Sequence, residues 1–380
     1  MDKEQDTSVK PLFLALLRYS LGIEETFPFT PTPEQWQQLY VESHRQSLVG
    51  MLFDGVNRLR GEQRPPMEMT MQWANEAEII RGMNGRLNTE CGRLTQLFEA
   101  EGHKTVILKG QANARLYPNP LNRMTGDIDI LVSGGTEKVL EMLDRLHLTG
   151  EDEEVSYHHV HLKEKVNGTE VEVHFRPVAF HYNEKLNQRM HDFLYDELKK
   201  GCEKTEYGFR VPSMKFALVM QLSHIHRHLV GEGLGMRQVI DYWILLRNST
   251  EEDRKVVASV LKKLKLNNMA RAMMWVISRL FDEKECLLPV KHNERKGRWV
   301  LDKMFRSGNF GKYSKEYPGL WETVNHFGTL YLERLWFDPS LFWPHTKEES
   351  KFWGYLLRSI PKRISKGTLL LRNTPNNNKK

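Results

Sequence analysis

Two aspartates stand two residues apart in the stretch DIDILV at residues 127–132. In a β-strand, residues i and i+2 share a face at a separation of roughly 6.6 Å, so we expect the carboxylates of Asp127 and Asp129 to project together. Like charges held this close raise each other's pKa or require a cation, and carboxylate oxygens suit Mg²⁺ beside substrate phosphates. The pair therefore predicts a divalent metal site. Replacing either aspartate by alanine should relieve the repulsion and so keep or raise thermal stability.

A third carboxylate is available in the stretch TEVEVHF at residues 169–175. Strand alternation places the two valines and Phe175 inward and leaves Glu170, Glu172 and His174 on the other face. If this strand lies beside Asp129, Glu172 completes a three-carboxylate cluster, with Glu170 as its rival. Such a cluster can hold two divalent ions, activate an attacking hydroxyl and stabilise a leaving pyrophosphate.

Lys109 and Gly110 directly follow a β-branched run and precede a helical pattern at residues 111–116. A glycine at such a turn lets backbone N–H groups approach a phosphate. Lys109 and Arg123 are candidate counter-charges for a triphosphate, and the alternative for each is an ordinary surface cation.

These motifs together resemble a known family. Leu-Lys-Gly at 108–110, Leu-Tyr-Pro at 116–118, Arg-x-x-x-Asp-Ile-Asp-Ile-Leu-Val from 123 and Val-Glu-Val-His-Phe at 171–175 are similar to a bacterial branch of the DNA polymerase beta-like nucleotidyltransferases. The resemblance covers residues 40 to 250 approximately. It implies that Asp127 and Asp129 bind both metals and that Glu172 binds one and helps to activate the acceptor. The superfamily's usual Gly-Ser is replaced here by Lys109-Gly110 with no serine following, so the phosphate contact differs.

The resemblance also implies a reaction. An NMP would move from an NTP to a hydroxyl group with release of pyrophosphate, with Mg²⁺ or Mn²⁺ as cofactor. A small-molecule acceptor such as a sugar is favoured. The alternatives are a toxin-like nucleotidyltransferase that acts on tRNA or protein, and a non-catalytic nucleotide-binding scaffold.

Histidines in the later helical part of the chain offer a second pattern. His224 and His228 have the i, i+4 spacing of metal ligands, but no third ligand is evident, and buried or surface histidines are the favoured interpretation. The resemblance implies instead that His228, Arg237 and Asp241 line the nucleotide or acceptor cleft.

The periodicity divides the chain into four parts. Residues 1–102 form an N-terminal helical region, with a capping box at residues 32–35, helical spacing through Val56 and a long helix from Met67 to Ala100. Residues 206–350 form a C-terminal helical domain, and residues 351–380 form a basic amphipathic or disordered tail.

Residues 103–205 form the catalytic α/β domain, with strands, a helix at 136–146 and a hairpin that turns at Asn167-Gly168. His159 and His161 share one face of the hairpin, where they touch substrate or form an exposed polar face. The predicted class is α+β: a small mixed-sheet nucleotidyltransferase domain flanked by helical regions.

Composition limits the partners. Residues 351–380 hold eight of the 55 Lys and Arg and no acid, so 47 basic residues face 49 acidic ones in the rest of the chain. This balance disfavours nucleic acid as a partner without excluding it, and the tail is either solvated or in weak contact with an anionic membrane or RNA. Three scattered cysteines, no signal peptide and no apolar run of membrane length predict a cytoplasmic protein.

Overall fold

The structure is a computed structural model, and every structural statement below concerns the residues it describes. These are residues 6–150, 154–166, 168–179, 183–230, 233–283, 286–308, 320–343, 346–347, 350–351, 353–354 and 358. Most of the predicted basic tail, residues 359–380, lies outside them.

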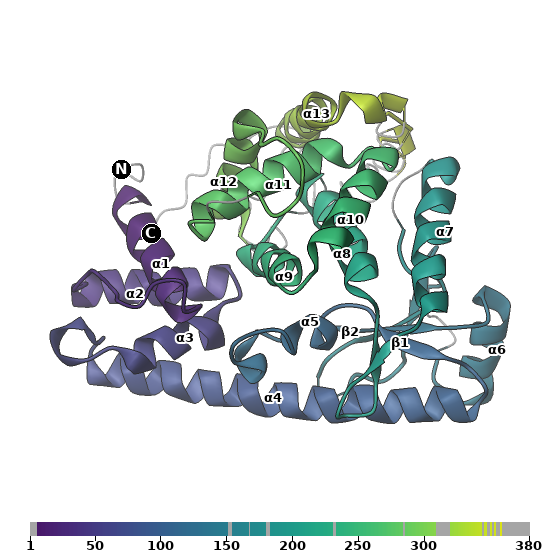
Figure 1. Cartoon of the computed structure of the whole chain (residues 1–380), viewed down its shortest axis with the longest axis horizontal. Coiled ribbons are helices and arrows are strands. Elements are labelled where there is room, and N and C mark those ends of the chain that lie inside the picture. The colour runs from purple at the N-terminus through teal and green to yellow at the C-terminus, as the bar shows by residue number, and fades with distance from the viewer. Residues whose placement is uncertain are drawn as a thin grey trace.

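Helices make up most of the described chain (Figure 1). The α-helices are α1 (Asp6–Ser20), α2 (Pro33–Arg45), α3 (Val49–Arg58), α4 (Met67–Ala100), α5 (Gln111–Ala114), α6 (Thr136–Arg145), α7 (Glu184–Lys200), α8 (Met214–Val230), α9 (Met236–Arg247), α10 (Glu251–Lys263), α11 (Asn267–Leu280), α12 (Glu294–Ser307) and α13 (Leu320–Phe337). The short 3₁₀ helices are η1 (Gly61–Gln63), η2 (Pro120–Asn122) and η4 (Pro339–Leu341). Within this part of the chain, no helix is long and apolar enough to cross a membrane.

A four-stranded mixed sheet lies between the helical regions. Its strands are β1 (Thr105–Ile107), β2 (Ile128–Val132), β3 (His159–His161) and β4 (Val171–His174). Their order is β1-β2-β4-β3; β2 and β4 run parallel, and the other two pairs are antiparallel. A separate ribbon pairs β5 (Glu203–Lys204) with β6 (Arg210–Val211). The predicted α+β class, a small mixed sheet flanked by helical regions, is confirmed.

The 34-residue helix α4 runs along one side of the molecule, from the N-terminal helices to the sheet (Figure 1). Near its start, Trp73 packs in a hydrophobic core that the N-terminal helices share with α8 to α12. Near its end, Phe98 packs in a second core beneath the sheet. Because one continuous helix contributes to both cores, it fixes the sheet relative to the helices.

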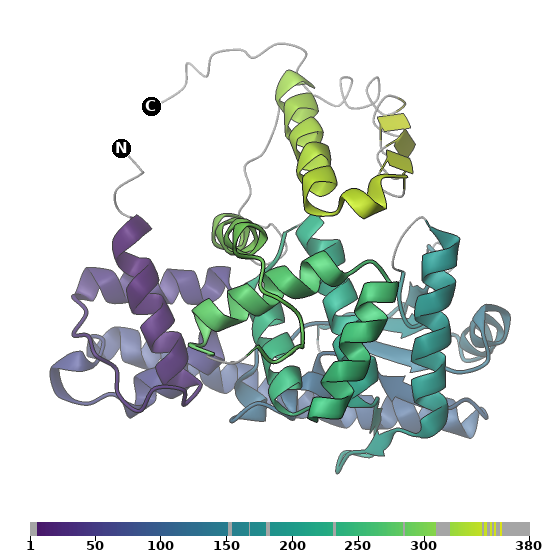
Figure 2. The same cartoon turned by 45° about the horizontal axis from the view of Figure 1, so that its top comes forward.

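The N-terminal and C-terminal helices lie side by side (Figure 2). The Nε of Arg18 in α1 donates a hydrogen bond of 2.8 Å to the carbonyl of Leu280 at the end of α11. This contact and the shared core connect segments that are 262 residues apart. The division of the chain into four parts remains a proposal.

The expected elements and the observed ones differ at Ser47. Helical spacing continues from Pro33 through Val56, yet α2 and α3 are separate, because Ser47 adopts a left-handed backbone with φ of 58°. The capping box of Thr32 and Gln35 forms as predicted. In the hairpin, Val166 pairs with Thr169 around Gly168, which has φ of 80°, whereas Asn167 lies outside the described residues.

Candidate functional site

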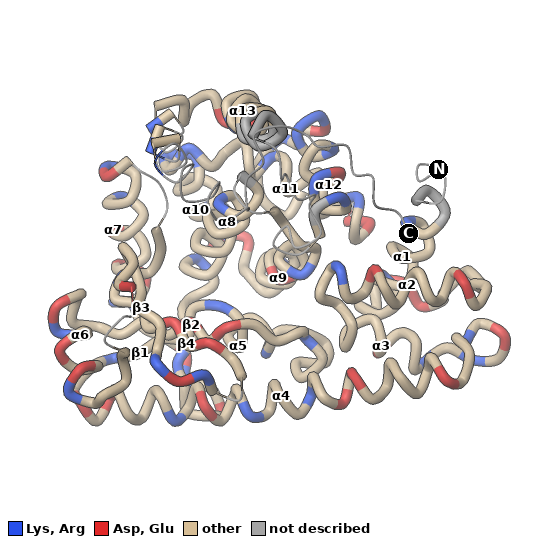
Figure 3. The backbone as a smooth tube through the Cα atoms, turned by 180° about the vertical axis from the view of Figure 1, so that it is seen from behind, with Lys and Arg blue, Asp and Glu red and all other residues tan. Residues whose placement is uncertain are grey.

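The register of the two parallel strands brings acidic residues together. Asp127 directly precedes β2, Asp129 lies within it, and Glu172 of β4 is the register partner of Asp129. Figure 3 shows the acidic residues of β2 and β4 next to each other. Ile128 and Ile130 face the opposite way, into the core beneath the sheet. The alternation of apolar and acidic residues therefore gives the sheet one apolar face and one face that carries the acidic residues.

Lys109 supplies a positive charge to the two aspartates. Its Nζ lies 3.1 Å from Oδ1 of Asp129 and 3.6 Å from Oδ2 of Asp127. Burial opposes the charge of this lysine, but the two carboxylates outweigh it and raise the pKa of Lys109 well above its usual value. The lysine is therefore charged at neutral pH and partly offsets the repulsion between the aspartates.

His174 makes the corresponding link between Asp129 and Glu172. Its Nε2 lies 3.1 Å from Oδ1 of Asp129 and 3.2 Å from Oε2 of Glu172. Burial disfavours the imidazolium, but these hydrogen bonds and charges outweigh it and raise the pKa of His174. Burial also disfavours ionised Glu172, yet the hydrogen bond with His174 and the charge of Lys109 lower its pKa to about 2. Glu172 is thus ionised at neutral pH.

Two further histidines extend this group, because His159 borders Glu172 and His158 borders His159. Nδ1 of His159 lies 3.5 Å from Oε2 of Glu172 and 3.1 Å from Nε2 of His158. Burial lowers the pKa of His158 to about 2 and also lowers the pKa of His159. Both rings are therefore neutral at pH 7. Our sequence analysis placed His174 on the acidic face but gave it no role, although its position two residues after Glu172 was the available signal.

The carboxylates of the site fit a divalent cation. Oδ2 of Asp129 is buried and has no hydrogen-bond partner within the described part of the chain, a state that costs free energy unless a cation or donor binds there. Asp127 keeps 39% of its side chain exposed, so substrate and water can reach it. Asp129, Glu172 and His174 each offer a ligand atom within 4.8 Å of the others. Carboxylates beside open solvent are the donors that Mg²⁺ prefers.

Gly110 holds the Lys109 turn close to the start of β2. Its φ is 57°, which disfavours any residue with a Cβ. A Cβ at this position would lie 3.3 Å from the carbonyl oxygen of Asp127. The positive φ and the close approach of two backbone segments, one carrying Lys109 and the other carrying Asp127, together favour glycine here.

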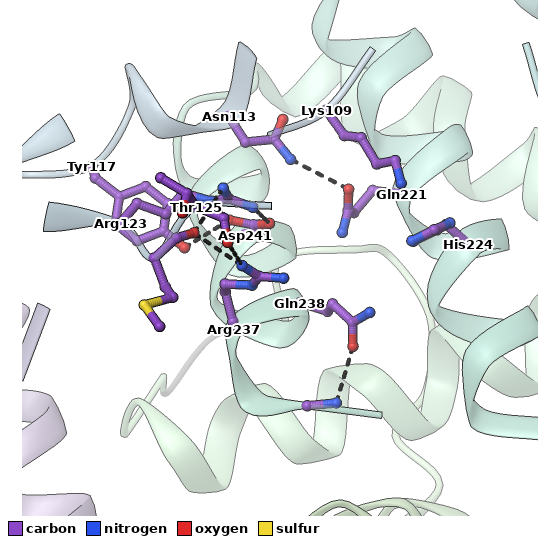
Figure 4. A network of polar contacts seen from close by, with 12 residues as sticks. Lys109, Asn113, Tyr117, Arg123, Thr125, Gln221, His224, Arg237, Gln238 and Asp241 are labelled. Atoms are coloured by element: carbon purple, nitrogen blue, oxygen red, sulfur yellow. Dashed lines mark hydrogen bonds and ion pairs between the residues drawn. The ribbon is translucent and has the colours of Figure 1, made fainter. Parts of the chain in front are cut away.

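Arg123 and Asp241 bind each other in a buried pair (Figure 4). Nε of Arg123 donates to Oδ1 of Asp241 at 2.8 Å and Nη2 to Oδ2 at 2.7 Å, and the hydroxyl of Tyr117 donates to Oδ1 at 2.6 Å. Burial disfavours the ionised carboxylate, but Arg123 outweighs this cost and lowers the pKa of Asp241. The pair fastens α9 to the segment that leads into β2.

The side chain of Arg237 binds the backbone of the same segment. Its Nη1 donates to the carbonyl oxygens of Met124 at 2.9 Å and Thr125 at 2.8 Å (Figure 4). Burial and the nearby Arg123 lower the pKa of Arg237 to about 10, so the guanidinium remains charged. Since Thr125 is two residues before Asp127, Arg237 fixes the backbone that presents this aspartate.

Helix α8 contributes two side chains, Gln221 and His224, near the Lys109 turn. Asn113 donates to Gln221 at 3.3 Å, and His224 lies near the Lys109 side chain (Figure 4). Burial and the charge of Lys109 hold the pKa of His224 well below its usual value. Nε2 of His228 lies 3.0 Å from Nε2 of His224. Among the described residues, this pair is not part of any group of three potential metal ligands.

Comparisons with known proteins bear on this geometry. A search of solved structures found an antigenic nucleotidyltransferase-like protein from Paracoccidioides brasiliensis, with 14% identity and a TM-score of 0.35, covering 56% of this chain and 97% of that one; at this score we draw nothing from it. No curated protein matches the chain. The model of a family described as "Uncharacterised nucleotidyltransferase" matches residues 32–282, which include every site residue discussed above. The chain therefore belongs to this nucleotidyltransferase family.

Proposed function

We propose that the protein transfers an NMP from an NTP to a hydroxyl group of a small-molecule acceptor, with release of pyrophosphate. The observation that carries this proposal is the linkage of three carboxylates through two basic side chains: Lys109 contacts Asp127 and Asp129, and His174 contacts Asp129 and Glu172. Family membership supports an NTP as the substrate.

The transfer forms a bond between the acceptor oxygen and the α-phosphorus and breaks the bond from that phosphorus to the oxygen bridging to the β-phosphate. Ionised Glu172 is suited to accept a hydrogen bond from the acceptor hydroxyl and to orient its oxygen, and the hydroxyl proton passes to water. A Mg²⁺ or Mn²⁺ ion held by Asp127, Asp129 and Glu172 would neutralise charge on the phosphate oxygens.

The remaining predicted residues are proposed either to contact substrate directly or to position the residues that do. Lys109 and the backbone at Gly110 are proposed to contact the phosphates, because the lysine is charged and lies at the aspartates. His228 is proposed to contact nucleotide or acceptor from α8. Arg123, Asp241 and Arg237 are proposed to act indirectly, since their charged groups bind one another or the backbone before Asp127.

Labelled NTPs test the proposal. The full-length protein is incubated with each NTP, Mg²⁺ or Mn²⁺ and a cell extract, and the label is followed into small molecules, tRNA and protein. We expect label in the small-molecule fraction and its loss in Asp127→Asn. Label in tRNA or protein would support the toxin-like alternative. Nucleotide binding by calorimetry without pyrophosphate release from any extract would overturn the transferase proposal in favour of a scaffold.

A further inference from the structure

Three imidazoles gather near Glu172: those of His158, His159 and His174. His159 of β3 is the register partner of His174 of β4, and His158 directly precedes β3. The His159 ring centroid lies 4.3 Å from that of His158 and 5.2 Å from that of His174. The site thus has an oxygen-rich half at the aspartates and a nitrogen-rich half at Glu172.

Three imidazole nitrogens lie close enough together to share one metal ion. Zinc binds imidazole nitrogen and carboxylate oxygen at about 2.0–2.1 Å, so two ligand atoms on a tetrahedral ion are about 3.3 Å apart. Here Nε2 of His158 and Nδ1 of His159 are 3.1 Å apart, and His158, His159 and His174 each offer one nitrogen within 4.8 Å of the other two. Nδ1 of His174 is buried and has no hydrogen-bond partner within the described residues, so this nitrogen is available to a cation while Nε2 stays bonded to Asp129 and Glu172.

Burial separates this group from an ordinary polar strand face. His158 is 8% exposed and His174 is 4% exposed, and the side chains of His159 and Glu172 are 15% and 17% exposed. Ordinary surface histidines are solvated singly, whereas these rings are packed against each other and are largely removed from water. Bringing so many polar rings together costs desolvation free energy, which a bound cation offsets.

We propose that His158, His159 and His174 form a second cation site, which binds a divalent transition metal of the Zn²⁺ class. Three imidazole nitrogens favour Zn²⁺ over Mg²⁺, which requires oxygen ligands and an octahedral arrangement. The site differs from the one at Asp127 and Asp129 in its donors and in its preferred ion. Its existence does not depend on nucleotide transfer.

Metal binding to the full-length protein tests the proposal in the absence of nucleotide. The protein is stripped with a chelator, dialysed and titrated with Zn²⁺ against a chromophoric chelator, and in parallel with Co²⁺, whose visible absorption reports a tetrahedral site. We expect one tightly bound Zn²⁺ per chain and a tetrahedral Co²⁺ spectrum. His158→Ala and His159→Ala should each weaken Zn²⁺ binding by at least about 100-fold, because each removes a direct ligand.

Three further variants make the assignment specific. His44→Ala, a histidine of α2 that pairs with Glu76 instead, should leave Zn²⁺ affinity unchanged, and so should Asp127→Asn. Equal loss in Asp127→Asn and His159→Ala would overturn the proposal, because the ion would then lie among the carboxylates. Loss in His161→Ala with full binding in His158→Ala would also overturn it, in favour of the outer group of His159, His161 and Glu172.

X-ray absorption at the zinc edge of the wild-type protein does not depend on the folding of any variant. The proposed site predicts several imidazole ligands around a four-coordinate ion. A six-coordinate, oxygen-only spectrum, or no stoichiometric zinc in the wild type, would refute it.

Discussion

Asp129 and Glu172 lie opposite each other on adjacent parallel strands and share one hydrogen-bonding partner, Nε2 of His174. The pairing depends on register, because a slip of one residue would turn Glu172 into the core and bring Val173 to the acidic face. Two buried valines of β4, Val171 and Val173, hold that register. The hydrophobic core beneath the sheet thereby determines which acid meets Asp129.

The first prediction compares two neighbouring glutamates. Glu172→Gln should lower nucleotide transfer by more than about 100-fold, because it removes a carboxylate proposed to bind the metal and orient the acceptor. Glu170→Gln is the matched control, since Glu170 is exposed and pairs with Lys165 at 2.7 Å. Initial rates of pyrophosphate release measure both variants. Similar losses of activity in the two variants would show that Glu172 is not part of the site.

The second prediction concerns the stability of the metal-free protein. The sequence alone suggests that losing either aspartate relieves repulsion, but the ion pairs of Asp129 with Lys109 and His174 change this expectation. Asp129→Ala leaves those cations without their buried partner and should lower the free energy of unfolding by about 3–5 kcal/mol. Asp127→Ala, at a partly exposed position, should change it by less than about 1 kcal/mol.

Urea unfolding in the presence of a chelator measures this difference. Equal stability of the two variants would show that the contacts of Asp129 with Lys109 and His174 contribute nothing net.

Local patterns predicted several elements because their causes are local. The helix α4 was expected from Met67 to Ala100 and has these bounds, since periodicity defines it and Gly102 accepts a left-handed backbone, with φ of 86°, just after its end. Alternation in β4 likewise placed Glu172 and His174 on one face. The break at Ser47 was missed, because nothing in the residue type requires its positive φ.

Partners that are distant in the chain could not be predicted from spacing. Arg123 was expected to face a triphosphate, yet it binds Asp241, 118 residues later, in a buried pair. Such a pair leaves no periodic signal, because each residue alone is an ordinary charged side chain. The link from Lys109 to Asp129 is similar: the sequence showed a candidate cation, and only the fold shows which charge it meets.

The third prediction separates a positioning role from nucleotide contact. Arg237→Ala removes the hydrogen bonds to the carbonyls of Met124 and Thr125, so the backbone before Asp127 should lose its fixed position. We expect kcat to fall by about 10- to 100-fold, with little change in the KM for NTP. Arg247→Ala, on the same helix but exposed, is the matched control. A raised KM with normal kcat would instead indicate direct nucleotide contact by Arg237.

The fourth prediction concerns the pH dependence of stability in metal-free protein. His174 has a pKa raised above 6.5 in the folded state, so its contribution to stability is complete below about pH 6.5 and is lost as the pH rises through the folded-state pKa. Lys109 remains charged over this range because its pKa is also raised, and Glu172 remains ionised because its pKa is about 2. Neither Lys109 nor Glu172 therefore contributes to the pH dependence of stability over this range.

Unfolding free energies of the wild type and His174→Gln, measured in chelator from about pH 6 to 9, isolate this effect. Other titrating groups contribute equally to both proteins and cancel in the difference. We expect the stability advantage of the wild type to shrink as the pH rises. An advantage that is constant or grows over this range would show that His174 is not held as an imidazolium between Asp129 and Glu172.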